Sequence, residues 1–167
     1  MPFDLRIATP SDSAALAGLH VETFREAHGG GPPVHVREAQ WQRILNVNNA
    51  LDFTLLVEND SRQLVGFARG TRHDGGIPGY QGELNKIYVV KRLHGHGCGR
   101  LLVREVAARF LSQGVTSMLL FGDARSPSNG FYERLGAVRL LSPEGEFHGG
   151  YGWPDLAKLV VRYGGRD

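Results

Sequence analysis

The segment RLHGHGCGR, from Arg92 to Arg100, sets residues that could do chemistry in a very bare backbone. Glycine occupies every second position from Gly95 to Gly99, and two histidines and the only cysteine of the chain alternate with it. Such a stretch could bind a phosphate group through backbone amides at a helix N-terminus. It could also hold a metal ion, present a reactive thiol or form a plain tight turn.

The metal and thiol interpretations have little support. His94 and His96 flank one glycine, but no third ligand follows at a spacing typical of a metal site, so we expect no metal. Cys98 near a helix start could be a nucleophile, although a small buried side chain is the more common role of a lone cysteine. The phosphate-binding interpretation and the tight turn remain open.

Known nucleotide motifs do not match the loop. A P-loop needs Gly-Lys followed by Ser or Thr, whereas this loop has Gly-Cys-Gly-Arg. The dinucleotide fingerprint Gly-x-Gly-x-x-Gly requires uneven spacing, and the glycines here are evenly spaced.

Hydrophobic periodicity indicates which elements position the loop. We expect four helices, one from about Ala15 to Phe24, one around Trp41, one from Arg100 to Gly114, and a short one opened by Ser126 and Pro127. The expected strands are Leu5–Ala8, Phe53–Glu58, Gln63–Thr71, Glu83–Val90, Ser117–Phe121, Ala137–Leu141 and Leu156–Val161.

This order predicts one α/β (or α+β) layered domain over residues 1–167, because no linker or repeat interrupts it. The hydrophobic fraction of 41% and the charged fraction of 22% are those of a soluble globular protein. A net charge of +2 without a basic stripe argues against nucleic acid. No apolar run approaches the roughly 20 residues that span a bilayer, and the start MPFDLRIATPSD does not resemble a signal peptide, so we expect a cytoplasmic protein.

Together with the residues before and after it, the loop forms a more specific sequence pattern. LNKIYVVKRLHGHGCGRLLVREV resembles the acetyl-CoA-binding segment of the GNAT superfamily of N-acetyltransferases, as a small bacterial-type member. If Gly97 and Gly99 are the family's glycine pair, His94 stands where Arg or Gln is usual. SPSNGFYERLGAVRL, from Ser126, is similar to a second family segment, with serine in place of asparagine. HVETFREAHGGGPP, from His20, is similar to a third.

The resemblance implies a fold and a co-substrate. The family fold is a mixed, mostly antiparallel sheet of about six or seven strands flanked by about four helices. Acetyl-CoA would be the co-substrate, with no metal. Its pantetheine arm would pair with the backbone of Ile87, Tyr88 and Val89, and Ser126 and Ser128 would touch it. Its pyrophosphate would lie in the loop formed by His94, Gly95, His96, Gly97, Cys98, Gly99 and Arg100.

The implied reaction is direct transfer of an acetyl group to a primary amine of a small molecule. Tyr132 would be the general acid, since a free tyrosine has a pKa of about 10 and is protonated at neutral pH. Glu83 would accept the amine proton through water, and the N–H of Val89 would stabilise the oxyanion. Packing of Tyr132 and simple solvation of Glu83 are the competing interpretations.

The acceptor site would use the first two helices and the loop from His73 to Tyr80. The candidates to line it are Phe24, Arg25, His28, Trp41, Tyr80 and Asn85. The segment Gly145–Asp155 would be a flap or a dimer contact. The resemblance also implies a possible homodimer, since members of the family commonly form one.

Two other functions remain open at this point. The loop would equally serve a non-catalytic acyl-CoA-binding sensor or scaffold, which needs no acid or base. A protein N-terminal acetyltransferase would use the same chemistry on a peptide.

Overall fold

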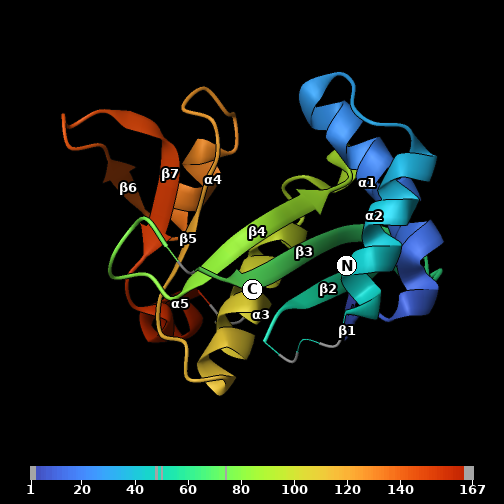
Figure 1. The fold of residues 1–167 in the computed structure, drawn as a ribbon, viewed down its shortest axis with the longest axis horizontal. Coiled ribbons are helices and arrows are strands. Elements are labelled where there is room, and N and C mark those ends of the chain that lie inside the picture. The colour runs from blue at the N-terminus through green and yellow to red at the C-terminus, as the bar shows by residue number, and fades with distance from the viewer. Residues whose placement is uncertain (1–2, 48, 50, 74, 164–167) are drawn as a thin grey trace. The chain divides into compact units, whose positions relative to one another are not determined.

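The computed structural model describes residues 3–47, 49, 51–73 and 75–163 of the chain. Short 3-10 turns at Pro10–Asp12 and Lys91–Leu93 precede the first and third helices. The elements in chain order are β1 (Asp4–Ile7), α1 (Ser13–His28), α2 (Val34–Asn46), β2 (Phe53–Glu58), β3 (Leu64–Arg72), β4 (Gly82–Val89), α3 (Cys98–Ser112), β5 (Met118–Leu120), α4 (Asn129–Arg134), β6 (Val138–Leu141), β7 (Phe147–Trp153) and α5 (Leu156–Tyr163) (Figure 1).

The strands form a mixed sheet in the order β1-β2-β3-β4-β5-β7-β6. β1 pairs with β2, β5 with β7 and β6 with β7 in antiparallel fashion, and β4 pairs with β5 in parallel. The β4–β5 register comprises Gly82 with Met118 and Glu83 with Leu119. The fold class predicted from the sequence, a mostly antiparallel sheet with helices, is confirmed.

The chain divides into two compact units, which share β3, β4 and α3. Unit 1 comprises residues 1–69 and 86–102, and unit 2 comprises residues 70–85 and 103–167. A single domain over residues 1–167 stays a prediction.

In unit 1, α1 and α2 lie side by side and cover one face of the sheet (Figure 1). Trp41 of α2 is 1% exposed, and its ring meets that of Phe67 on β3 edge to face, with centroids 5.6 Å apart. Successive strand residues point to opposite faces, so the neighbouring Gly66 faces the other way. A Cβ at Gly66 would lie 3.4 Å from the sulfur of Cys98, so the bare strand lets the start of α3 approach closely.

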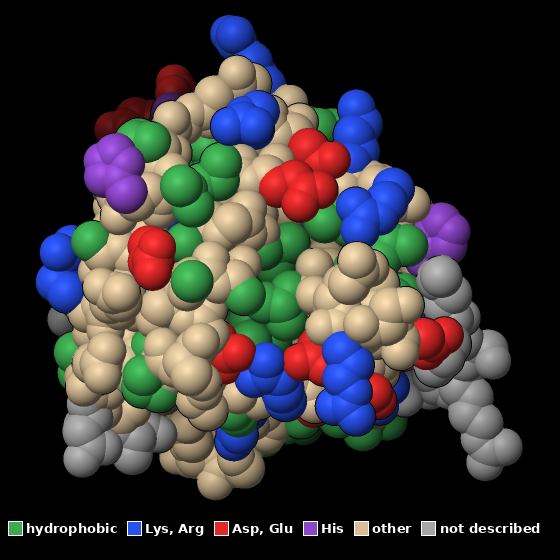
Figure 2. Space-filling view, turned by 90° about the vertical axis from the view of Figure 1, so that its right-hand side faces the viewer, with side chains coloured by type: hydrophobic (Ala, Val, Ile, Leu, Met, Phe, Trp, Pro, Cys, Tyr) green, Lys and Arg blue, Asp and Glu red, His purple; other side chains and the backbone are tan. Residues whose placement is uncertain are grey.

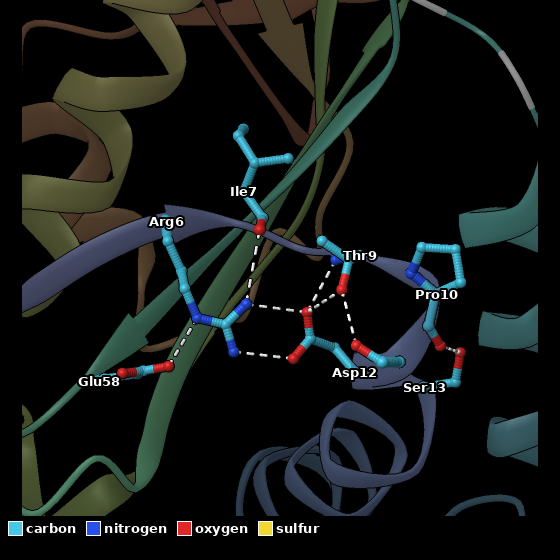
Figure 3. Close-up of polar contacts among 8 residues, drawn as sticks. Arg6, Ile7, Thr9, Pro10, Asp12, Ser13 and Glu58 are labelled. Atoms are coloured by element: carbon cyan, nitrogen blue, oxygen red, sulfur yellow. Dashed lines mark hydrogen bonds and ion pairs between the residues drawn. The ribbon is translucent and has the colours of Figure 1, made fainter.

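A charge cluster ties the start of α1 to β1 and β2 (Figure 3). The guanidinium of Arg6 donates to both carboxylate oxygens of Asp12, at 2.7 and 2.8 Å, and to Glu58 at 2.6 Å. The backbone N–H of Thr9 also donates to Asp12, at 2.7 Å. These bonds, those from Arg6 first, lower the pKa of the Asp12 carboxyl to about 2. The cluster therefore fixes the point at which α1 leaves the sheet.

In unit 2, helix-to-sheet packing again uses bare strand positions. A Cβ at Gly82, the first residue of β4, would lie 2.9 Å from the ring of Phe110 on α3. A Cβ at Gly152 of β7 would lie 2.4 Å from Tyr80, so this glycine makes room for the tyrosine ring. The indole N–H of Trp153 donates to the carbonyl of Leu135 at the end of α4, at 3.1 Å.

The predicted last strand, Leu156–Val161, is wrong, because these residues belong to helix α5. Leu156 and Leu159 are buried while Ala157 and Lys158 between them are exposed, which is helical rather than strand spacing. The carboxylate of Asp155 accepts the N–H of Ala157 at 3.1 Å, as a capping residue does.

The last strand comes instead from the glycine-rich stretch Phe147–Trp153, so these residues do not form a loop-like flap. The alternative prediction, a dimer contact over Gly145–Asp155, stays a prediction. The predicted cap of the short helix also shifts. α4 begins at Asn129 with Ser128 at its N-cap, and Ser126 accepts the N–H of Ser128 in the preceding turn, at 3.1 Å.

The surface carries charges of both signs. On the side that Figure 2 presents, Lys and Arg side chains are interspersed with Asp and Glu, and hydrophobic side chains show between them. None of the helices in the described residues is long and apolar enough to cross a membrane.

Replacing Asp12 by Asn tests the charge cluster. The carboxylate has a lowered pKa in the folded state, so its stabilisation is full above the unfolded value of about 4 and is lost as the pH falls towards 2. We expect Asp12→Asn to lower the free energy of unfolding by about 1–3 kcal/mol at pH 7, measured by urea denaturation. The deficit should shrink below pH 4, and Asp60→Asn, an exposed hairpin carboxylate, should change little. A deficit independent of pH would contradict this account.

Candidate active site

The glycine loop turns the chain from β4 into α3. At its start, the N–H of Val90 donates to the carbonyl of Val65 at 2.9 Å, which keeps the chain on the sheet. Gly95 and Gly97 then adopt left-handed φ angles of 83° and 87°, a conformation that favours glycine. A Cβ built at either position has no atom within 4 Å, so space does not require glycine there. The left-handed backbone conformation does, and both positions face open space.

The start of α3 supplies the groups that the sequence predicted for phosphate binding. The N–H of Leu101 bonds to the carbonyl of Gly97 at 3.0 Å, so Gly97 stands at the N-terminal end of the helix. The first N–H groups of a helix have no acceptor within the helix and point outward at its N-terminus. The helix dipole adds positive potential at the same end. The bare, outward-open loop lies at such an end and can accept an anion.

His94 acts differently from the longer side chain that the family resemblance led us to expect. Its Nε2 lies 2.9 Å from the backbone carbonyl of Val89, the last residue of β4. Because a carbonyl only accepts, Nε2 must carry the proton in this bond. His96 Nδ1 lies 3.3 Å from the carbonyl of His94 in the same way. His94 therefore holds the loop against the end of the strand, and His96 makes its contact within the loop.

Cys98 is buried and serves packing. Its side chain is 1% exposed, and burial raises the pKa of its thiol to about 11. The thiolate needed for nucleophilic chemistry is therefore scarce at neutral pH. Within the part of the chain that the structure describes, no group of three or more His, Cys, Asp or Glu residues could hold a metal ion.

A cluster of rings lies between the helices and the sheet of unit 1. His20, which is 2% exposed, has ring centroids of Phe67, Tyr88 and Trp41 within 5.7 Å. Its Nδ1 accepts the indole N–H of Trp41 at 3.1 Å, so Nε2 carries the proton of the neutral ring. Burial, with the charges of Arg37 and Lys86, lowers its pKa to about 4, so His20 is neutral at pH 7.

The predicted acceptor residues of unit 1 lie in two environments. Trp41 is in the core, which favours packing over substrate contact. Phe24 and His28 lie together with ring centroids 4.4 Å apart, and His28 Nε2 is 3.4 Å from the hydroxyl of Tyr88. Burial raises the pKa of that hydroxyl. Tyr88 therefore contributes its side chain to this cluster, a role that the sequence did not indicate.

A cavity of about 220 Å³ opens beside Phe24. The guanidinium of Arg37 stacks over the Phe24 ring, 4.8 Å from its centroid, and Arg25 approaches from α1. Among the described residues, no carboxylate forms an ion pair with either arginine. The cavity can therefore accept an anionic group. Its lining residues are Val21, Phe24, Arg25, Gly30, Gly31, Pro32 and Arg37.

In unit 2, Glu83 has polar neighbours on both sides. Its Oε2 accepts the side-chain N–H of Asn85 at 2.9 Å, as expected for two residues on one strand face. Its Oε1 lies 3.9 Å from Nδ1 of His73. The carboxylate is therefore oriented, although its side chain is 20% exposed.

Tyr132 of α4 is half-buried in a second ring cluster. Its centroid lies 5.4 Å from that of Phe131, 5.7 Å from that of Tyr151 and 6.2 Å from that of Trp153. Glu133, the next residue, accepts the hydroxyl of Tyr151 and an N–H of Arg139. These bonds hold α4 against β7 and β6 and so position Tyr132.

The remaining predicted residues lie in the same unit. Tyr80 packs on Gly152 of β7, and burial raises the pKa of its hydroxyl. Ser126 is half-buried in the turn before α4, and Ser128 is exposed.

Comparison with known proteins places this geometry in a family. The model of the Acetyltransferase (GNAT) family matches residues 15–137. A curated relative, the uncharacterized N-acetyltransferase YuaI of Bacillus subtilis (strain 168), is 26% identical, over 93% of this chain and 95% of its own length.

Solved structures show the same fold. A GNAT-family acetyltransferase of Staphylococcus aureus Mu50 superposes with a TM-score of 0.73 at 16% identity, covering 90% of this chain and 98% of that one. The PaiA N-acetyltransferase of Thermoplasma acidophilum, solved in complex with coenzyme A, gives 0.68 at 18% identity, covering 91% and 98%. The family match spans more than half of the chain, so the protein belongs to the GNAT acetyltransferase family and is an acyltransferase.

Proposed function

We propose that the protein transfers the acetyl group of acetyl-CoA to a primary amine of a small molecule. The observation that carries the proposal is the loop at the start of α3, where Gly95 and Gly97 adopt left-handed φ angles with open space beside them at a helix N-terminus. The first amides of a helix can bind an anion there. The similar fold of PaiA, which was solved with coenzyme A, supports the identity of that anion.

In this proposal, the loop from His94 to Arg100 binds the pyrophosphate through amides at the helix N-terminus. The backbone of Ile87 to Val89 pairs with the pantetheine amides as an added strand would. Ser126 and Ser128, before α4, contact the same arm. Acetyl-CoA supplies an activated acetyl thioester, and no metal is required.

The chain's residues then move protons and stabilise charge. Glu83 takes a proton from the ammonium group through water, which frees the lone pair that attacks the thioester carbon. The N–H of Val89 donates to the carbonyl oxygen as negative charge builds on it. Tyr132 protonates the sulfur as the carbon–sulfur bond breaks, and it is reprotonated from the new amide nitrogen. Acetylated amine, CoA and one proton, released from Glu83, are the products.

The cavity in unit 1 narrows the choice of acceptor. Its two arginines lack carboxylate partners among the described residues, and a substrate carboxylate would supply one. We therefore favour an amine that also carries an acid group, such as an amino acid, over a polyamine or a protein N-terminus. The cytoplasmic location and the homodimer stay predictions.

Replacing Gly97 by Ala tests the phosphate-binding loop. We expect the dissociation constant of acetyl-CoA, measured by calorimetry, to rise about tenfold, because alanine disfavours the left-handed conformation and distorts the amides. Gly114 is a matched control, since it has a φ of 78° and open space but stands at the other end of α3. Gly114→Ala should lose similar stability and bind acetyl-CoA normally. Equal effects of both variants on binding would contradict the proposal.

Replacing Tyr132 by Phe and Glu83 by Gln tests the catalytic roles. Each change should lower kcat at least about 100-fold and leave the dissociation constant of acetyl-CoA unchanged, because both groups act on protons. The rate is measured as the loss of thioester absorbance. Glu144→Gln, in an exposed turn, is the control and should leave kcat unchanged. Tight acetyl-CoA binding with no turnover by the parent protein on a broad amine panel would favour a non-catalytic sensor or scaffold.

The acceptor class can be tested with amino acids and their carboxamides, which differ in one charge. We expect the free acids to give the higher kcat/KM, and Arg37→Gln to lower that value about tenfold without affecting the carboxamides. Arg43→Gln, an exposed arginine on the same helix, should change neither. Equal rates for acids and carboxamides would exclude this role of the cavity.

A further inference from the structure

His73, the residue after β3, lies at the base of the β3–β4 hairpin with its side chain 9% exposed. Its backbone N–H donates to the carbonyl of Gln81 at 2.9 Å, which fixes the residue beside the start of β4. Its ring makes two directed contacts. Nε2 lies 3.4 Å from the backbone N of Ile77, and Nδ1 lies 3.9 Å from Oε1 of Glu83.

The first contact determines where the ring carries its proton. A backbone N–H can only donate, so Nε2 of His73 must accept with its lone pair. The neutral ring then has its proton on Nδ1, and that N–H faces Glu83. At 3.9 Å the pair is too long for a direct hydrogen bond, so the neutral ring acts on the carboxylate through its dipole.

Glu83 is thus held from two sides by different elements. Asn85 on β4 donates to Oε2 at 2.9 Å, and His73 from the hairpin faces Oε1. The ring of Phe121, 6.0 Å from that of His73, is an apolar neighbour. Within the part of the chain that the structure describes, the Glu83 carboxylate is the charged group that the His73 ring faces.

We propose that His73 is a positioning residue for Glu83. The Ile77 N–H orients the ring, the ring presents Nδ1–H to the carboxylate, and the carboxylate is thereby held in the orientation in which it receives the amine proton. The catalytic half of this inference rests on the proposed function, whereas the ring geometry does not.

A nitrogen-15 NMR spectrum tests the geometry without any turnover. The neutral His73 ring should show the Nδ1–H tautomer, assigned by the loss of its signals in His73→Phe. Signals of the Nε2–H tautomer would overturn the proposal, because Nε2 could then not accept from Ile77.

A double-mutant cycle tests the positioning role. His73→Phe should lower kcat about tenfold in the parent and have no further effect in a Glu83→Gln background, since His73 acts through that carboxylate. His73→Asn, whose amide N–H can take the place of Nδ1–H, should restore part of the loss. His148→Phe is the matched control, because His148 faces Glu146 at 3.6 Å on the exposed surface.

The outcomes separate this inference from the proposed function. If Glu83→Gln retains full activity, Glu83 is not the base, and both that role and the catalytic half of the inference fail. Suppose instead that Glu83→Gln lowers kcat as expected, but His73→Phe lowers kcat by the same factor in the parent and in the Glu83→Gln variant. His73 then has only a structural role, and the proposed function stands.

Discussion

The structure depends on a turn of unusual backbone geometry between β4 and α3. Two of three consecutive residues, Gly95 and Gly97, are left-handed, which costs an ordinary residue roughly 1–2 kcal/mol each. Because the turn is short, it fixes the direction of α3 relative to the strand end just before it. The hydrogen bond from His94 to Val89 and the packing of Cys98 beneath Gly66 then hold the loop from both ends. The proposed anion site relies mainly on backbone amides and needs this rigidity, because amides cannot adjust their positions as long side chains can.

Bare strand positions recur beneath the residues proposed for catalysis. Gly82, packed against Phe110, precedes Glu83 and fixes where β4 begins. Gly152 admits the ring of Tyr80, and its neighbours Tyr151 and Trp153 carry the hydrogen bonds that hold α4. In both places a glycine lets an aromatic ring sit directly on the backbone. The proposed acid and base therefore belong to closely packed elements, although each side chain retains some exposure.

The sequence predicted most elements because their burial follows simple periodicity. Phe53–Glu58 was predicted with the bounds it has, because its short length, its aromatic and β-branched residues and the turn residues that follow it together favour a strand. Leu156–Val161 was misjudged because a short apolar run fits a strand or a helix, and the capping Asp155 that decides between them was not weighed. The glycines of Phe147–Trp153 suggested a loop, but close neighbours explain two of them within the strand: a Cβ at Gly152 would meet the ring of Tyr80, and one at Gly149 would meet the backbone of Gly122. His73 had no local signal, because its partner lies ten residues away and meets it only when the hairpin forms.

The burial of Cys98 has a practical consequence. The chain has one thiol, and the folded protein keeps it protonated and shielded against Gly66. Reagents that react with thiolates should therefore leave the native protein unmodified, so that thiol released from a CoA thioester can be measured without background. The same reagents should label Cys98 once unfolding exposes it, and the rate of labelling then reports how often the start of α3 opens.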